Sequence, residues 1–347
     1  MSERLKIETG IQRTPGGDGV SRDVGRWARE AEAFGFDGFV SSDLDYDAFL
    51  PLPLVAEHTE SINVATRIAT AFTRSPMILA YNACDMQEYT NGRFQLGLGT
   101  QVQAHNERRF SVEWDSPSRQ LREVIEALRH IWQDVFQEND SSALNYEGKY
   151  YSLDLMTDLF NPGPIDDPYI PIHIAGINKY NSRLAGELCD GICLHPVSSP
   201  SYIEEKINQW VAEGANKANR RPADIETIAA PYVITGKTDE ELTREREKAR
   251  REIAFYGSTP SYHVVFEHHD WDEVGDKLHT LSQEQKFEKA KELVTDEMID
   301  TLAVQAPVDT LGDELRRQYS DIVDCLYLSI DFDGEDYWHD VIETLHE

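Results

Sequence analysis

Residues 66–101 form one complete strand–helix–strand pattern, and this pattern constrains the fold more than any other part of the chain. Ile68–Phe72 is a short apolar run typical of a buried parallel strand, and Ser75-Pro76 supplies a helix N-cap followed by proline at the first helical position. The helical stretch that follows ends at Asn91-Gly92, where left-handed backbone costs little. Phe94–Gly99 is then the second strand, and two parallel strands joined by a helix indicate a fold in which strands and helices alternate.

The same alternation continues along the rest of the chain. Eight apolar runs of β type are separated mostly by amphipathic helical stretches, which predicts parallel strands with right-handed crossovers closing into a (β/α)8 TIM barrel. An open doubly wound sheet is the alternative. At 347 residues, one decorated barrel domain spanning residues 1–347 is the economical interpretation. The runs are Leu5–Thr9, Gly38–Ser41, Asn63–Phe72, Phe94–Gly99, Tyr169–Ala175, Gly191–Leu194, Ile228–Thr235 and Ile322–Ile330.

Two intervals are too long for simple connections between these elements. They span about residues 138–168 and 258–306, and we interpret both as insertions into the barrel. Segments of this length commonly serve as lids or as contacts between subunits, so either role is expected here.

The charge balance excludes several classes of partner. The chain has 63 acidic and 33 basic residues and a formal net charge of −30, so its surface repels nucleic acid and anionic membranes. Because salt screens such self-repulsion, we expect a halophilic protein from a molar-salt cytoplasm, with an ordinary acidic protein as the alternative. The first residues contain no signal-peptide core, which favours a cytoplasmic location. The cysteines and the His268-His269 pair do not form a ligand set, so no metal site is predicted.

Several of these segments resemble luciferase-like flavin and deazaflavin oxidoreductases. The resemblance covers almost the whole chain, and it implies a barrel that binds its cofactor at the carboxyl ends of the strands and forms a homo-oligomer, either a dimer or a tetramer. Parts of it are similar to a subfamily that uses coenzyme F420. The segments are 66–101, with its Gly-Arg-x-x-Leu-Gly-x-Gly strand, Ala31–Asp37, Asp190–Pro196 and, for the F420 subfamily, 96–110 and 251–260.

Two residues at strand ends are candidates for proton transfer. Asp43 follows the second strand and aligns with an acidic position of the family, whereas His195 closes the sixth strand. Since histidine titrates near about pH 6.5 and aspartate near about 3.9, His195 is the more natural acid or base near neutrality. Relatives that oxidise alcohols commonly carry His after the acidic residue and Glu after the fourth strand. Leu44 and Gln101-Val102 stand there instead, which argues against oxidation of alcohols or sugar phosphates.

Cofactor contacts are expected at three other strand ends. The glycines that end the fourth strand permit a flat ring to lie against bare backbone, and the family implies a non-prolyl cis peptide bond at Ala71-Phe72 beneath that ring. The turn after the fifth strand resembles the family's phosphate-binding turn, although an ordinary helix cap is an equal alternative. The predicted cofactor-binding residues are Thr70, Ala71, Phe72, Gly99, Thr100, Gln101, Ala175, Gly176, Ile177 and Asn178.

The resemblance thus implies an oxidoreductase that exchanges a hydride between F420 and a small organic molecule. Two alternatives stay open. One is an FMN-dependent monooxygenase that uses reduced flavin and oxygen, and the other is a barrel that binds the cofactor without catalysis. Oxygen consumption and turnover, respectively, distinguish these alternatives from the F420 enzyme.

Overall fold

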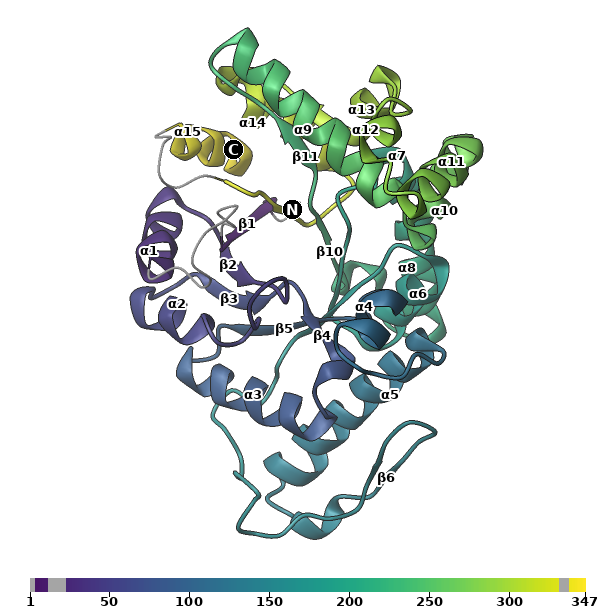
Figure 1. Cartoon of the computed structure of the whole chain (residues 1–347). Coiled ribbons are helices and arrows are strands. Elements are labelled where there is room, and N and C mark those ends of the chain that lie inside the picture. Colours follow the sequence, from purple (N-terminus) through teal and green to yellow (C-terminus); the bar gives the residue numbers. More distant parts are fainter. Residues whose placement is uncertain (1–3, 12–22, 331–336) are drawn as a thin grey trace.

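The computed structural model describes residues 4–11, 23–330 and 337–347. It contains a closed parallel barrel surrounded by helices (Figure 1). The strands run in the order β3-β2-β1-β13-β10-β9-β8-β5-β4, and pairing between β3 and β5 closes the ring. Because β3 and β4 share one place beside β5, eight strand positions surround the axis. The predicted (β/α)8 barrel is confirmed, and the open sheet is excluded.

The bounds of the elements follow the predicted alternation closely. The strands of the barrel are β1 (Lys6–Gly10), β2 (Gly38–Ser41), β3 (Asn63–Thr66), β4 (Ala69–Thr70), β5 (Phe94–Gly99), β8 (Ile172–Ala175), β9 (Gly191–Cys193), β10 (Glu226–Ala229) and β13 (Cys325–Tyr327). The helices are α1 (Val24–Phe34), α2 (Leu52–His58), α3 (Pro76–Tyr89), α4 (Gln103–Arg108), α5 (Pro117–His130), α6 (Lys179–Leu188), α7 (Pro200–Tyr202), α8 (Asn208–Lys217), α9 (Asp239–Gly257), α14 (Leu311–Tyr319) and α15 (Trp338–His346).

The unit predicted from residues 66–101 is present, although its first strand is interrupted. Ser75 caps α3 by accepting the Ile78 N–H at 3.3 Å, and the helix ends where Asn91 and Gly92 take positive φ. The first strand was predicted to run unbroken to Phe72. Instead β3 stops at Thr66 and β4 resumes for two residues, because the intervening Arg67 turns into the barrel to pair with a carboxylate.

The run predicted as one strand over Ile228–Thr235 is also divided. Pro231 lacks an N–H for the ladder, and the chain leaves the barrel after Ala229. It then forms β11 (Tyr232–Ile234), which pairs in parallel with β12 (Ala303–Gln305) outside the barrel. This small sheet brings the end of the second long interval back to the rim.

The two long intervals have different structures. Residues 138–168 contain the antiparallel hairpin of β6 (Tyr146–Glu147) and β7 (Ser152–Leu153) and extend away from the barrel below α3 and α5 in Figure 1. Residues 258–306 form a compact group with α9, built from α10 (His263–His268), α11 (Asp272–Gln283), α12 (Phe287–Lys291) and α13 (Asp296–Leu302). The described helices include none that is both long and apolar enough to cross a membrane.

Candidate active site

Four predicted residues occupy successive strand ends along one side of the barrel mouth. Thr70 pairs with Gly99, and the register of β5 with β8 brings Ala175 next to Gly99. A Cβ built on Gly99 would lie 3.2 Å from the Cβ of Ala175, so both positions face the same interior space. His195 follows two residues after Cys193, the register partner of Ala175. The residues predicted at the carboxyl ends of the strands therefore lie in one row, which runs from Thr70 to His195.

The surface of this row differs from the bare glycine wall that the sequence suggested. A Cβ on Gly99 would come within 2.6 Å of Ile68 Cδ1, so the Ile68 side chain already fills the space above this glycine. A Cβ on Gly97 would lie only 2.0 Å from the Thr66 carbonyl oxygen. The two glycines thus make room for the interrupted β3–β4 segment. Ile68, which is only partly buried, forms the apolar platform together with Ala175.

The cis peptide bond lies four residues before the position predicted from the sequence. The non-prolyl cis bond joins Arg67 to Ile68, and Ala71 and Phe72 belong instead to a buried 3-10 turn over Ala71–Thr73. The prediction at Ala71-Phe72 is wrong because the interruption of the strand comes before β4 rather than after it. Both residues pack into the core beneath the rim.

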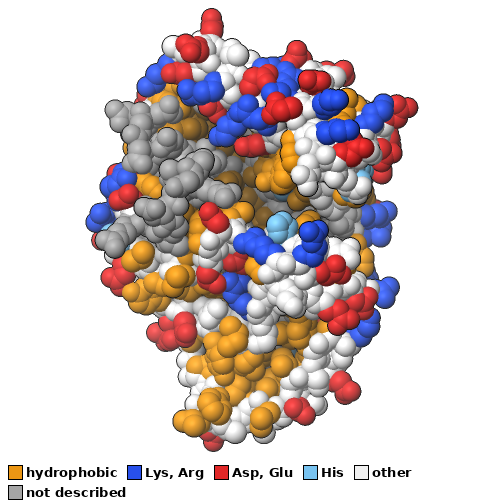
Figure 2. Space-filling view, in the orientation of Figure 1, with side chains coloured by type: hydrophobic (Ala, Val, Ile, Leu, Met, Phe, Trp, Pro, Cys, Tyr) orange, Lys and Arg blue, Asp and Glu red, His pale blue; other side chains and the backbone are white. Residues whose placement is uncertain are grey.

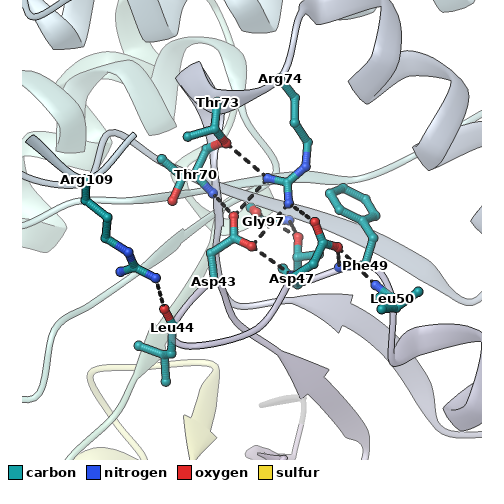
Figure 3. A network of polar contacts seen from close by, with 12 residues as sticks. Asp43, Leu44, Asp47, Phe49, Leu50, Thr70, Thr73, Arg74, Gly97 and Arg109 are labelled. Atoms are coloured by element: carbon teal, nitrogen blue, oxygen red, sulfur yellow. Dashed lines mark hydrogen bonds and ion pairs between the residues drawn. The ribbon is translucent and has the colours of Figure 1, made fainter. Parts of the chain in front are cut away.

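Asp43 is held by the protein itself (Figure 3). Its carboxylate accepts the Thr70 N–H at 2.7 Å, the Ala48 N–H at 2.8 Å and the Arg74 guanidinium at 2.8 Å. Arg74 also contacts Asp47, and although burial acts to lower the pKa of Arg74, the two carboxylates leave it raised. Because its acceptor sites are used in this way, Asp43 fixes the backbone at Thr70. Its predicted role in proton transfer stays a prediction.

A buried ion pair lies deeper in the barrel below the platform. Arg67 contacts the Glu8 carboxylate at 2.9 and 3.1 Å and Gln95 Oε1 at 2.5 Å. Burial raises the pKa of Glu8 against the opposing effect of Arg67, and burial also lowers the pKa of the nearby His173 well below its usual value. These charged and polar side chains support the floor of the mouth from beneath.

Most polar groups of the turn after β8 form hydrogen bonds within the protein. The Gly176 N–H bonds to the Cys193 carbonyl at 3.1 Å, and the Ile177 carbonyl accepts the Tyr202 hydroxyl at 2.7 Å. Asn178 Oδ1 caps α6 by accepting the N–H groups of Tyr180 and Asn181. The ordinary cap foreseen as the alternative is thus present, and phosphate binding by Gly176, Ile177 and Asn178 stays a prediction.

Strand β5, the fourth of the predicted strands, leads into a tight turn at the rim of the barrel. Gln101 adopts a φ of 56°, and its side-chain oxygen accepts the Val102 N–H at 3.0 Å. The Thr100 hydroxyl donates to the Gln101 carbonyl at 3.0 Å. Both residues are partly exposed beside the platform, so their predicted contact with a cofactor also remains to be tested.

His195 is enclosed by aromatic residues that the sequence did not assign to the site. Its ring centroid lies 4.3 Å from the ring of Tyr256, at the end of α9, and 4.3 Å from the ring of Tyr262. Burial lowers the pKa of His195 to about 3, so the imidazole is neutral at physiological pH. The sequence offered one signal, since residues 251–260 carried the resemblance to the F420 subfamily, but nothing in it placed these rings beside His195.

The strand ends at the mouth combine partly exposed apolar side chains with a buried hydroxyl that has no partner among the described residues. Ile68 and Ala175 offer a small apolar platform, and Thr70 Oγ1 is fully buried at its edge without a hydrogen-bond partner in the described structure. An unpaired buried hydroxyl costs free energy, and a polar edge of a bound ring could relieve that cost. The fold is thus a (β/α)8 barrel, and the carboxyl ends of its strands are the candidate site for a cofactor.

Comparison with known proteins identifies the family. Residues 5–325 match the family described as luciferase-like monooxygenase. An uncharacterised protein of Mycobacterium tuberculosis is 39% identical over 293 residues, which cover 84% of this chain and 85% of that protein. The 5,10-methylenetetrahydromethanopterin reductase of Methanolobus tindarius is 27% identical over 253 residues, covering 72% and 71%. The chain belongs to the luciferase-like monooxygenase family.

A solved structure shows the same fold. The coenzyme F420 dependent tetrahydromethanopterin reductase of Methanopyrus kandleri superposes with a TM-score of 0.76 over 99% of this chain and 98% of that chain. Because the sequence identity is 21%, this likeness bears on the fold alone.

Proposed function

We propose that this protein is an F420-dependent oxidoreductase. The observation that carries the proposal is the mouth itself, where an apolar platform adjoins the buried, unpaired hydroxyl of Thr70. A Mycobacterium tuberculosis protein described as a putative coenzyme F420-dependent oxidoreductase, 26% identical over 301 residues, supports F420 over other planar cofactors. When bound, the deazaflavin supplies the hydride chemistry, and an organic substrate is the other partner in the transfer.

Each residue of the mouth has a separate task in this proposal. Ile68 and Ala175 carry the ring, and Thr70 Oγ1 hydrogen-bonds to its polar edge. Asp43 and Arg74 hold the Thr70 backbone in place through the 2.7 and 2.8 Å contacts described above. His195 faces the substrate side of the mouth. Lys179, exposed at the start of α6, lies where an acidic cofactor tail leaving the mouth would pass.

An FMN-dependent monooxygenase is the second candidate, and the family as a whole favours it. The same platform suits either ring. The two functions differ in what happens to the reduced cofactor, because a reduced flavin reacts with oxygen whereas a reduced deazaflavin passes its hydride directly to a substrate.

The test is a pair of fluorescence titrations, one with F420 and one with FMN, in about 2 M KCl to screen the acidic surface. The proposal predicts saturable binding of F420, weak binding of FMN and no oxygen consumption by the reduced complex. Ala175→Phe, which fills the platform, should abolish F420 binding, and Tyr151→Phe in the remote 138–168 segment should not change it. Preferred binding of FMN with oxygen uptake would establish the monooxygenase, and tight binding of F420 without turnover of any substrate would indicate a binding protein.

We also propose that the protein forms a homo-oligomer through the face shown at the bottom of Figure 2. Apolar side chains gather there over α3 and residues 138–168, and Leu155, Leu159 and Phe160 are 80%, 85% and 63% exposed. Monomers seldom leave so much apolar surface in water. Since copies with a charge of −30 repel one another, an apolar face is where they can meet. Light scattering should give a dimer or tetramer, and Leu159→Asp should give monomers.

A further inference from the structure

The loop from β9 to α7 carries His195, and the second long interval, residues 258–306, contacts this loop at both of its ends. At the first end, the ring of Tyr262 lies 4.3 Å from the ring of His195. At the second end, His269 Nε2 and the Ser199 hydroxyl share a hydrogen bond of 2.8 Å. A segment outside the barrel is therefore joined to one loop of the mouth at two separate points.

The His269 ring is itself restrained by its neighbours. It stacks on the ring of Trp271, with the centroids 4.5 Å apart and an interplanar angle of 23°. The ring of His268 meets it edge-on at a centroid distance of 4.8 Å, and the His269 N–H bonds to the Phe266 carbonyl at 3.1 Å. Because these contacts restrict the imidazole, its hydrogen bond to Ser199 holds the loop against the end of α10.

Ser199 is the N-cap of the helix that follows the loop. Its side chain is fully buried, and its hydroxyl oxygen accepts the Tyr202 N–H at 3.1 Å. From α7 the chain continues through a π-helical stretch over Ile203–Ile207 into α8. Since the cap satisfies a donor of the first helical turn, the contact with His269 ties that turn to the second long interval.

The same helical turn reaches a second part of the mouth. The Tyr202 hydroxyl donates to the Ile177 carbonyl at 2.7 Å, and the Tyr202 side chain is only 1% exposed. Ile177 belongs to the turn after β8, where the sequence predicts cofactor binding. On its other side, the Tyr202 ring meets the ring of His268 at a centroid distance of 5.3 Å. The first turn of α7 thus connects the second long interval to two predicted parts of the site.

These contacts differ from those expected of a lid. A lid separates from the rest of the protein each time a ligand enters or leaves. Separation of residues 258–306 from the loop would break the bond between His269 and the buried Ser199 hydroxyl, and leaving a buried polar group without its partner costs free energy. The burial of Ser199 and Tyr202 favours a permanent attachment.

We propose, on the basis of the F420-dependent function proposed above, that residues 258–306 are a fixed part of the active site and that His269 is a positioning residue. Through Ser199 and the first turn of α7, His269 sets the position of His195 and of the turn after β8. The segment thereby determines how a ligand is held at the mouth, and His269 does so without touching the ligand.

The first test needs no ligand and uses NMR spectra of the protein with labelled histidines in about 2 M KCl. The His195 signals, assigned by comparison with His195→Gln, report the position of a ring that lies 4.3 Å from two tyrosine rings. His269→Ala should shift these signals. His279→Ala is the matched control, because it removes a 2.8 Å bond to the Ser258 carbonyl within the same interval, and it should leave them in place.

A conservative variant keeps the test decisive if the alanine variant does not fold. The amide of His269→Gln can still hydrogen-bond to Ser199, so its His195 signals should stay close to those of the wild type. Unshifted His195 signals in His269→Ala, or equal shifts in His269→Ala and His279→Ala, would overturn the inference. So would a folded His269→Gln variant with displaced His195 signals and an unchanged His279→Ala spectrum in which His269→Ala is also unchanged.

The second test measures F420 affinity by fluorescence titration. His269→Ala should weaken binding roughly three- to tenfold, as the loss of one hydrogen bond does, and His279→Ala should not change it. Tyr202→Phe, which loses the bond to Ile177, should weaken binding to a similar extent. Because both residues act through one helical turn, the two losses should not add in the double variant. Native affinity in His269→Ala, or fully additive losses, would contradict the inference.

The two tests separate this inference from the proposed function. If the wild-type protein does not bind F420, the proposed function fails, whereas the histidine spectra still report whether His269 positions His195. If the wild type binds F420 and the His195 signals do not respond to His269→Ala, the inference alone fails.

Discussion

The two sides of the barrel mouth differ in their charged groups, although each side has one buried hydroxyl without a partner among the described residues, that of Thr70 and that of Tyr232. On the side of β2 and β4, Asp43 accepts three close hydrogen bonds and Arg74 is shared between two carboxylates. On the side of β9 and β11, no charged pair accompanies the unpaired Tyr232 hydroxyl among the described residues, and His195 accepts the Val197 N–H at Nδ1. This difference indicates where a ligand is expected. A polar group that is hydrogen-bonded within the protein stabilises the fold, whereas a buried polar group without a hydrogen-bond partner is available to a ligand.

The largest change in stability is expected at Asp43, on the side of the mouth formed by β2 and β4. Asp43→Ala should lower the free energy of unfolding by about 2–3 kcal/mol, since it leaves the Thr70 N–H without its acceptor and removes one of the two carboxylates of Arg74 at a site where the Asp43 side chain is only 9% exposed. Urea denaturation in about 2 M KCl measures the loss. Asp115→Ala removes an exposed pair with Lys149 and should change little. Equal losses in the two variants would show that Asp43 is not a structural anchor.

The next effect concerns the edge of the platform. Thr70→Val keeps the shape of the side chain and removes its unpaired hydroxyl, so F420 affinity should fall about tenfold while stability is kept or slightly increased. Thr9→Val is the matched control, because its hydroxyl is also buried without a partner among the described residues but alternates with the inward-facing Glu8 on β1. An unchanged F420 affinity in Thr70→Val would remove Thr70 from the site.

A smaller effect of opposite sign is expected on the neutral side. Tyr232→Phe should raise the free energy of unfolding by about 1 kcal/mol, because it removes a buried hydroxyl that has no partner in the free protein. Thermal unfolding compares it with the wild type. A variant that is less stable than the wild type would mean that the hydroxyl is already satisfied and is not reserved for a ligand.

The smallest effect is a dependence on pH. The folded state holds the pKa of His195 at about 3, below the usual value of about 6.5 in the unfolded chain, so the unfolded chain binds a proton that the folded one does not. The contribution of His195 to stability is therefore present above pH 6.5 and decreases as the pH falls towards the folded pKa. Between pH 7.5 and 6, His195→Gln should lose about 0.8 kcal/mol less stability than the wild type. Parallel losses would indicate an ordinary, protonated histidine.

Much of the fold was predictable because it depends on local signals. Alternating apolar runs, the Ser75-Pro76 helix start and the Asn91-Gly92 stop each act within a few residues, and the structure shows all of them. The interruption at Arg67 was missed because its cause is a long-range partner, Glu8, which lies 59 residues earlier in the chain.

The site was predictable only for residues at the carboxyl ends of barrel strands, where active sites of such barrels lie. This position selected four residues that lie along one side of the mouth, namely Thr70, Gly99, Ala175 and His195. It could not select Ile68, whose side chain covers a glycine of another strand, or the tyrosines, which reach the rim from segments outside the barrel. The predicted preference for molar salt stays a prediction that depends on the net charge of −30.

The crystal structure of the F420 complex would test the central claim most directly. The account predicts that the ring rests on Ile68 and Ala175, that Thr70 Oγ1 hydrogen-bonds to its edge, and that its open face is turned towards His195. A cofactor ring bound elsewhere, for example in the groove of about 810 Å³ lined by α5, α6 and α8, would contradict the account, as would a complex in which Thr70 Oγ1 remains unpaired.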